Sequence, residues 1–183
     1  MELQKSRPDK HQHFLNLAKV VAERSTCLRR KVGAIIVDGE GVELSSGYSG
    51  APRRTEHCID IGKCLRIELN IPSGKNYELC RAVHAEQNAI INAARTGASI
   101  VGGEMYISSE KNKVAYNNEH GEDKIYGPCI ICKKEIINAG LMAVHMREEG
   151  IGEKSYTLEQ IKELLAKEEE EWKKKYVKGN KII

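Results

Sequence analysis

The chain has 183 residues and a formal net charge of +3, a length that suits one domain with a complete core, without a composition break that would indicate a second. This positive excess is smaller than that of a dedicated nucleic-acid-binding domain. Because the N-terminal stretch is charged and no apolar run reaches the length of a membrane span, we expect a single cytoplasmic domain over residues 1–183.

The first half of the chain predicts one helix and two strands. Apolar residues recur at helical spacing over residues 12–24, which indicates a helix with one buried face. A β-branched run follows from Val32, a glycine turn covers residues 39–41, and an alternating stretch begins at Val42, so that a β-hairpin is expected. Residues 49–82 contain prolines, glycines and three cysteines, which is typical of a long structured loop without regular elements.

The second half alternates helices with strands. Four elements are expected: a helix over 84–95, a strand from Glu104, a helix over 129–139 and a strand over 141–146. The polar segment 109–127 is too long for a plain connection, so we expect it to be functional. Thr157 and Gln160 form a capping-box pattern before a charged helix over about 157–178. This order predicts an α/β fold with a core over about 12–147, in which helices cover both faces of a mixed sheet.

One histidine and one pair of cysteines stand at the expected starts of two helices. Cys129 and Cys132 form a Cys-x-x-Cys pair, and the positive end of a helix dipole favours their thiolate form. Together with His84 they would give zinc three protein ligands, and an open fourth position for water defines a catalytic site. Zinc lowers the pKa of such a water to about 7. Glu86, two residues beyond the histidine, could then transfer protons between that water and a substrate.

Each part of this pattern has a simpler interpretation when it is taken alone. A single Cys-x-x-Cys pair can be a structural zinc site or a redox pair, and a histidine at a helix start can be a capping residue. Taken together, however, the residues provide three metal ligands and a proton-transfer group. We therefore interpret His84, Glu86, Cys129 and Cys132 as one catalytic zinc site.

The stretch His84-Ala85-Glu86, followed by the sequence PCIIC from Pro128, resembles the signature of zinc-dependent nucleobase deaminases. The resemblance extends from Phe14 to Met146. It is strongest to the deoxycytidylate (dCMP) branch of the cytidine and deoxycytidylate deaminase family, on the basis of three features: the glycine-rich GYSGAPR from Gly47, the NAI that continues the glutamate's helix, and the arginines before the first strand.

Membership of that family would imply a three-layer cytidine-deaminase-like fold with a central mixed sheet. It would also imply a zinc-dependent hydrolase that deaminates a cytosine nucleotide, most simply dCMP to dUMP and ammonia, in pyrimidine deoxynucleotide metabolism. The dCMP branch further implies a homo-oligomer and regulation by deoxynucleoside triphosphates.

The resemblance also suggests where a nucleotide would bind. Basic side chains that could bind its phosphate flank the first strand and the glycine-rich segment, and Arg30 is the first candidate among Arg29, Arg30, Lys31, Arg53 and Arg54. Further substrate-binding candidates are Ser49, Gly50, the backbone N–H of Ala85, Tyr126 and Pro128. Many relatives have an asparagine where this chain has Ser49, so a hydroxyl replaces an amide at this position.

Four cysteines remain outside the catalytic pattern: Cys27, Cys58, Cys64 and Cys80. Four thiols are the number that a closed structural zinc site requires, and such a site would stabilise a long loop. The resemblance points the same way, because some dCMP deaminases carry a second, structural zinc in this region. The spacing contains no tight pair, and His57 could replace Cys58 as a ligand. Separate reduced cysteines and disulfides therefore remain alternatives.

Two other functions share parts of this pattern. A deaminase of a base in a polynucleotide, such as tRNA adenosine, would use the same zinc and glutamate, but we would expect a more basic face and open access to its pocket. A zinc-stabilised binding module without catalysis would have no use for Glu86. A small nucleotide is therefore the expected partner, whereas nucleic acid and membranes are not.

Overall fold

The computed structural model describes residues 7–71, 75–111 and 127–177. Within these ranges a five-stranded sheet with the order β2-β1-β3-β4-β5 forms the centre of the molecule. Its strands are β1 (Arg30–Val37), β2 (Glu43–Tyr48), β3 (Glu104–Lys111), β4 (Ala143–Glu148) and β5 (Gly152–Thr157). Strands β3 and β4 are parallel and the other neighbours are antiparallel, so the sheet is mixed, as predicted.

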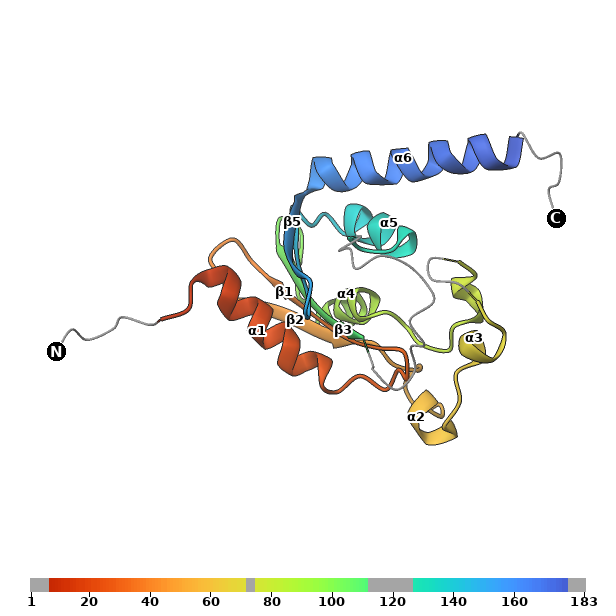
Figure 1. Cartoon of the computed structure of the whole chain (residues 1–183). Helices are drawn as coiled ribbons and strands as arrows, with labels where there is room; N and C mark the ends of the chain where they lie inside the picture. The colour runs from red at the N-terminus through yellow and green to blue at the C-terminus, as the bar shows by residue number, and fades with distance from the viewer. Residues whose placement is uncertain (1–6, 72–74, 112–126, 178–183) are drawn as a thin grey trace.

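Helices cover both faces of this sheet (Figure 1). Helix α1 (Lys10–Ala22) packs on one face, where Phe14 and Leu15 form an apolar cluster with strand residues such as Ile35. Helices α4 (Ala85–Thr96) and α5 (Ile130–Asn138) pack on the other face, over a larger apolar cluster. The predicted arrangement of a mixed sheet between helical layers is therefore confirmed.

Two glycines allow helices to approach the sheet closely on its opposite faces. A Cβ atom on Gly33 of β1 would lie 2.2 Å from the carbonyl oxygen of Ala18 in α1. A Cβ atom on Gly47 of β2 would lie 2.3 Å from the backbone nitrogen of Ala89 in α4. Because both neighbours are helix backbone, any larger residue would push the helix away from the sheet.

The C-terminal helix α6 (Leu158–Val177) lies along α5 (Figure 1). Its capping box is formed as predicted: the Thr157 N–H donates to Gln160 Oε1 at 2.9 Å, and the Gln160 N–H donates to Thr157 Oγ1 at 3.3 Å. Among the described residues, no helix is both long enough and apolar enough to cross a membrane.

The sequence prediction missed strand β5, because only Tyr156 is buried in this edge strand and its neighbours show no apolar alternation. The prediction that residues 49–82 lack regular elements was also wrong. Three single turns occur there: α2 (Cys58–Ile61), α3 (Leu65–Glu68) and the 3-10 helix η1 (Tyr77–Leu79). Elements this short have no periodicity to detect.

The long segment predicted over 109–127 begins later than expected, because β3 continues to Lys111. Residues 112–126 lie outside the described part of the chain. The expectation that this segment is functional therefore stays a prediction.

Candidate active site

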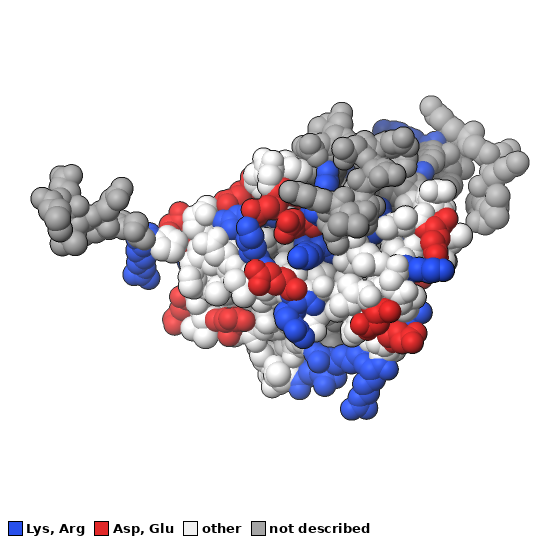
Figure 2. Space-filling view, turned by 60° about the horizontal axis from the view of Figure 1, so that its bottom comes forward, with Lys and Arg blue, Asp and Glu red and all other residues white. Residues whose placement is uncertain are grey.

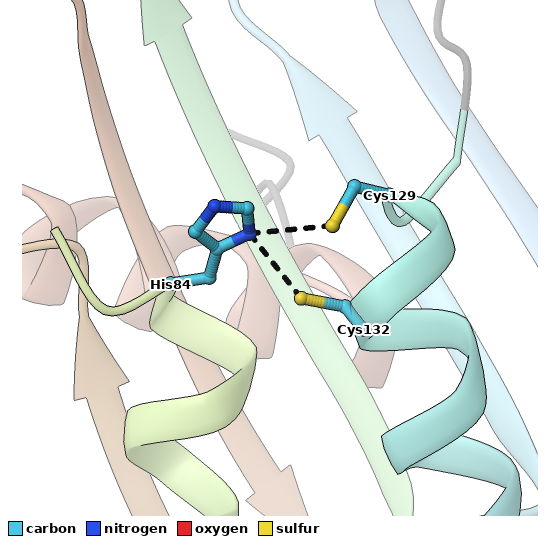
Figure 3. A group of neighbouring side chains, drawn as sticks. All are labelled: His84, Cys129 and Cys132. Carbon is cyan, nitrogen blue, oxygen red and sulfur yellow. Dashed lines mark hydrogen bonds between the residues drawn. The ribbon is translucent and has the colours of Figure 1, made fainter. Parts of the chain in front are cut away.

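One histidine and two cysteines that follow it by 45 and 48 residues come together at the starts of two helices. His84 is the N-cap residue of α4 and Cys129 is the N-cap residue of α5. The Cys129 and Cys132 sulfurs lie 3.3 and 3.4 Å from His84 Nδ1 (Figure 3). The three ligand atoms lie within 4.8 Å of one another, so the predicted metal-ligand group is formed.

The segment before α4 is hydrogen-bonded to the end of β2 and to the residues that follow this strand. Gly50 and Val83 form an isolated β-bridge, with the Val83 N–H donating to the Gly50 oxygen at 2.8 Å and the Gly50 N–H donating to the Val83 oxygen at 3.2 Å. Asn88, in the first two turns of α4, donates from its Nδ2 to the backbone oxygen of Tyr48 at 2.8 Å. These contacts fix the backbone on both sides of His84.

The spacing of the three side chains fits a zinc ion. At usual bond lengths and tetrahedral angles, zinc holds nitrogen and sulfur ligands about 3.6 Å apart. The observed 3.3 and 3.4 Å are within a few tenths of an ångström of that separation. One imidazole nitrogen and two sulfurs are also ligands that zinc prefers. His84, Cys129 and Cys132 would therefore hold the ion and leave a fourth position open.

The two thiols have opposite electrostatic environments in the metal-free protein. Hydrogen bonds from Cys132 and then from His84 lower the pKa of Cys129 to about 4, although its burial opposes this shift. The hydrogen bond to Cys129, followed by burial, raises the pKa of Cys132. The lowered pKa favours the thiolate form of Cys129, and a bound zinc ion would deprotonate both cysteines.

Glu86 lies in the first turn of α4 and its side chain is only 6% exposed. Burial raises the pKa of its carboxyl group, while the nearby His84 opposes that shift. A carboxyl group that is excluded from water beside a metal centre is the environment expected of a proton-transfer group. The position predicted for Glu86 from the sequence suits this role.

The predicted substrate-binding residues lie around the same end of α4. Gly50 belongs to the bridge described above, and Ala85 begins the helix, where backbone N–H groups have no intrahelical partner. Ser49 is buried, and its hydroxyl lies 2.7 Å from the hydroxyl of Ser25. Pro128 is buried before Cys129, whereas Tyr126 lies outside the described residues. Their roles in substrate binding stay predictions.

Arg30, the first candidate for binding phosphate, already has a partner within the protein. Its Nη2 donates to Glu148 Oε1 at 2.8 Å, in an ion pair whose carboxylate side chain is only 6% exposed. A phosphate would have to compete with this carboxylate or use the remaining donors of the guanidinium. Arg53, a second candidate, donates to Asn92 Oδ1 at 2.7 Å.

Sequence reasoning considered Tyr77 only as one of several tyrosines that could stack on a base and favoured a packing role for it, and it missed Arg66 as a neighbour of the site. The Tyr77 ring meets the His84 ring edge-on, with centroids 5.2 Å apart. The guanidinium carbon of Arg66, which is 4% exposed, lies 5.0 Å from the centre of the Tyr77 ring, and its Nη2 donates to the Lys75 oxygen at 2.6 Å. The sequence contains seven tyrosines and offers no spacing that would distinguish this one.

The four remaining cysteines gather in one region but do not form a compact ligand group. Burial raises the pKa of Cys58, and the charges of Cys27, Cys64 and Cys80 add to this effect, so the four thiols are neighbours. Among the described residues, however, these cysteines do not form a group of three or more ligand atoms within 4.8 Å of one another, as His84, Cys129 and Cys132 do. The second zinc site stays a prediction.

Comparison with known proteins places most of the chain in one family. Residues 8–148 match the model of the cytidine and deoxycytidylate deaminase zinc-binding region. A deoxycytidylate deaminase of Schizosaccharomyces pombe is 30% identical over 138 residues, covering 75% of this chain but only 37% of that protein's length. A deoxycytidylate deaminase of Mycobacterium phage D29 is 32% identical over 143 residues, covering 76% of this chain and 94% of that protein.

A solved structure has a similar fold. The crystal structure of dCMP deaminase from the cyanophage S-TIM5 in its apo form superposes with a TM-score of 0.56 at 26% sequence identity. The match covers 86% of this chain and 94% of the phage enzyme. Strand β5 and helix α6 lie beyond the residues that match the family model.

Proposed function

This chain belongs to the cytidine and deoxycytidylate deaminase zinc-binding family, and from that premise we propose that it deaminates a cytosine nucleotide, converting dCMP into dUMP and ammonia. The observation that carries the proposal is the group of His84, Cys129 and Cys132 beside the buried carboxyl group of Glu86. The names of the relatives from S. pombe and phage D29 supply the substrate.

The chemistry requires a water molecule to replace the amino group at C4 of cytosine. A zinc ion bound by the three ligands would supply a water of lowered pKa at neutral pH. Glu86 would accept a proton from the attacking water and place it on ring atom N3. It would then take the remaining proton from the hydroxyl group on C4 and deliver it to the departing amine, so that water and the cytosine nucleotide become a uracil nucleotide and ammonia.

The backbone at the start of α4 would orient the ring. Ala85 is completely buried, and its N–H belongs to the first helical turn, which lacks intrahelical acceptors. The ring of Tyr77 borders His84 and would form part of the wall beside the reacting atoms. Both groups favour a small planar base as the substrate.

A free nucleotide suits the charge distribution better than a polynucleotide does. On the face shown in Figure 2, Lys and Arg side chains are interspersed with Asp and Glu, apart from a basic group at the lower edge. A broad surface that tracks a phosphate backbone would carry a continuous excess of positive charge.

We also propose that the protein acts in the cytoplasm as a homo-oligomer regulated by deoxynucleoside triphosphates.

Substrate preference tests the proposal. Ammonia release should be measured with purified zinc-loaded protein on dCMP, dCTP, deoxycytidine, cytidine and tRNA. Because a charge-assisted hydrogen bond to phosphate contributes about 1.5–3 kcal/mol, kcat/KM should be about 10- to 100-fold higher for dCMP than for deoxycytidine. Equal values for these two substrates would remove the phosphate site, and activity on tRNA alone would replace the proposal with the polynucleotide function.

A further inference from the structure

A hydrogen-bonded connection joins the two helices that carry the metal ligands. Gln87 stands three residues after His84 on α4, and Glu135 stands three residues after Cys132 on α5. Residues three apart lie on the same side of a helix, so each of these side chains is one turn beyond a metal ligand. Gln87 Nε2 donates to Glu135 Oε1 at 2.8 Å.

The same glutamine also binds the backbone of a metal ligand. Its Oε1 accepts a hydrogen bond from the His84 N–H at 2.9 Å. Both ends of the Gln87 amide are therefore occupied, one by the first metal-ligand segment and one by the second helix. A shift of α5 relative to α4 would break the bond to Glu135 or displace the backbone of His84.

Glu135 places a polar atom in the protein interior without a hydrogen-bond partner among the described residues. Its second oxygen, Oε2, is buried and has no hydrogen-bond partner among the residues that the structure describes. An unsatisfied buried polar atom costs about 1–3 kcal/mol, and an apolar residue of similar size would avoid that cost. The hydrogen bond from Gln87 to Oε1 is the side-chain contact of Glu135 that offsets this cost.

We propose that Gln87 and Glu135 form a strut that sets the distance between the two ligand-bearing helices, and that both are positioning residues for the metal. The inference rests on the proposed zinc site. Partners of this kind, which hold metal ligands without touching the metal, typically contribute about 10- to 100-fold to metal affinity.

Zinc affinity, measured by competition with a chromophoric chelator, tests the strut without any substrate. Glu135→Leu removes the acceptor, whereas Glu135→Gln keeps an oxygen that Gln87 can reach. We expect Glu135→Leu to bind zinc at least about 10-fold more weakly than the wild type, and Glu135→Gln to stay within about 3-fold. Unchanged affinity in Glu135→Leu would overturn the proposal, as would an equal loss in Glu135→Gln.

A matched control separates the strut from the general attachment of α4. Ser45 Oγ donates to the Ala89 oxygen at 2.6 Å, which ties the same helix to β2 away from the ligands. Ser45→Ala should lower the thermal midpoint of the metal-free protein and leave zinc affinity within about 3-fold. If Ser45→Ala weakened zinc binding as much as Glu135→Leu, helix attachment in general would explain the effect and the strut would be rejected.

A double variant shows whether the two residues act as one unit. In Gln87→Leu/Glu135→Leu, zinc affinity should be no lower than in Gln87→Leu alone, because the bond is lost once. Additive losses would contradict the strut. If the wild-type protein itself bound no zinc, the proposed function would fail; if the wild type bound zinc and deaminated dCMP while Glu135→Leu matched it, the strut alone would fail.

Discussion

Glu86 is a buried carboxyl group in the first turn of α4, two residues beyond the metal ligand His84. We predict that Glu86→Gln keeps the fold and the zinc ion but loses turnover, because an amide cannot accept and release the proton. General acid–base groups contribute about 10²- to 10⁴-fold, so kcat should fall at least that far.

Zinc content and the thermal midpoint of Glu86→Gln should be measured with kcat on the same preparation. Both should match the wild type, since the amide is nearly isosteric with the acid. A variant that kept more than about a tenth of the wild-type kcat would disprove the catalytic assignment.

Tyr77 packs against a metal ligand instead of binding the metal. Its ring contact with His84 is of a kind that contributes about 0.5–1.5 kcal/mol, so Tyr77→Ala should weaken zinc binding by about 2- to 10-fold. Tyr77→Phe retains the ring and should stay close to the wild type. Chelator competition on the three proteins measures these zinc affinities. If Tyr77→Phe bound zinc as weakly as Tyr77→Ala, the hydroxyl group and not the ring would be responsible for the effect.

The elements around the site differ in how well the sequence foretold them. Helices α4 and α5 follow the N-cap residues His84 and Cys129, which are also the residues that indicated the metal site, so the sequence predicted the helix starts and the candidate site together. The contact between Gln87 and Glu135 was not predicted, because it depends on how the two helices are rotated against each other. Strand β5 was missed because hydrogen bonding to β4, and not an apolar pattern, places it in the sheet.

Helix α6 is joined to the ligand-bearing helix α5 by a buried charge. Lys133, next to Cys132, is 1% exposed and its ammonium group binds Glu168 of α6. We predict that Glu168→Gln lowers the free energy of unfolding by about 2–3 kcal/mol, below the usual 3–5 kcal/mol for a buried pair because Glu168 is 38% exposed. Urea unfolding of the metal-free protein measures this change.

The exposed pair Lys162 and Glu159 on the same helix provides the control. Glu159→Gln should change the free energy of unfolding by less than about 0.5 kcal/mol, since solvent screens this pair. Lys133→Met should cost less than Glu168→Gln, because it removes the buried charge together with its need for a partner. Equal effects of Glu168→Gln and Glu159→Gln would show that the buried pair does not anchor α6.

The loop that carries α2 and α3 supplies Cys58, Cys64 and Cys80, and Cys27 joins them from the segment between α1 and β1. A second zinc ion bound by these four cysteines stays a prediction. Elemental analysis of reduced protein prepared without chelator should then find a second zinc per chain, which Cys58→Ser/Cys64→Ser removes while the loop becomes sensitive to protease. The catalytic zinc should remain in that variant. A wild-type protein with a single zinc would exclude the second site.

On the scale of the whole molecule, the fold brings two helix starts together on one face of the sheet. Gly47 lets α4 lie close to β2, and the pairing of β3 with β4 places α5 beside α4 (Figure 1). The metal ligands, the buried carboxyl group and the positive ends of two helix dipoles consequently converge. Helix α6, which lies beyond the part that matches the family, adds a further layer over α5.

The central claim is that these residues form a zinc-dependent deaminase, and a zinc titration of metal-free protein in the presence of dCMP tests it most directly. We predict no dUMP or ammonia before zinc is added, equal amounts of both products as zinc is restored to the wild type, and neither product from Glu86→Gln loaded with the same zinc. Turnover that persisted after zinc was removed, or a zinc-loaded wild type that left dCMP unchanged, would contradict the account.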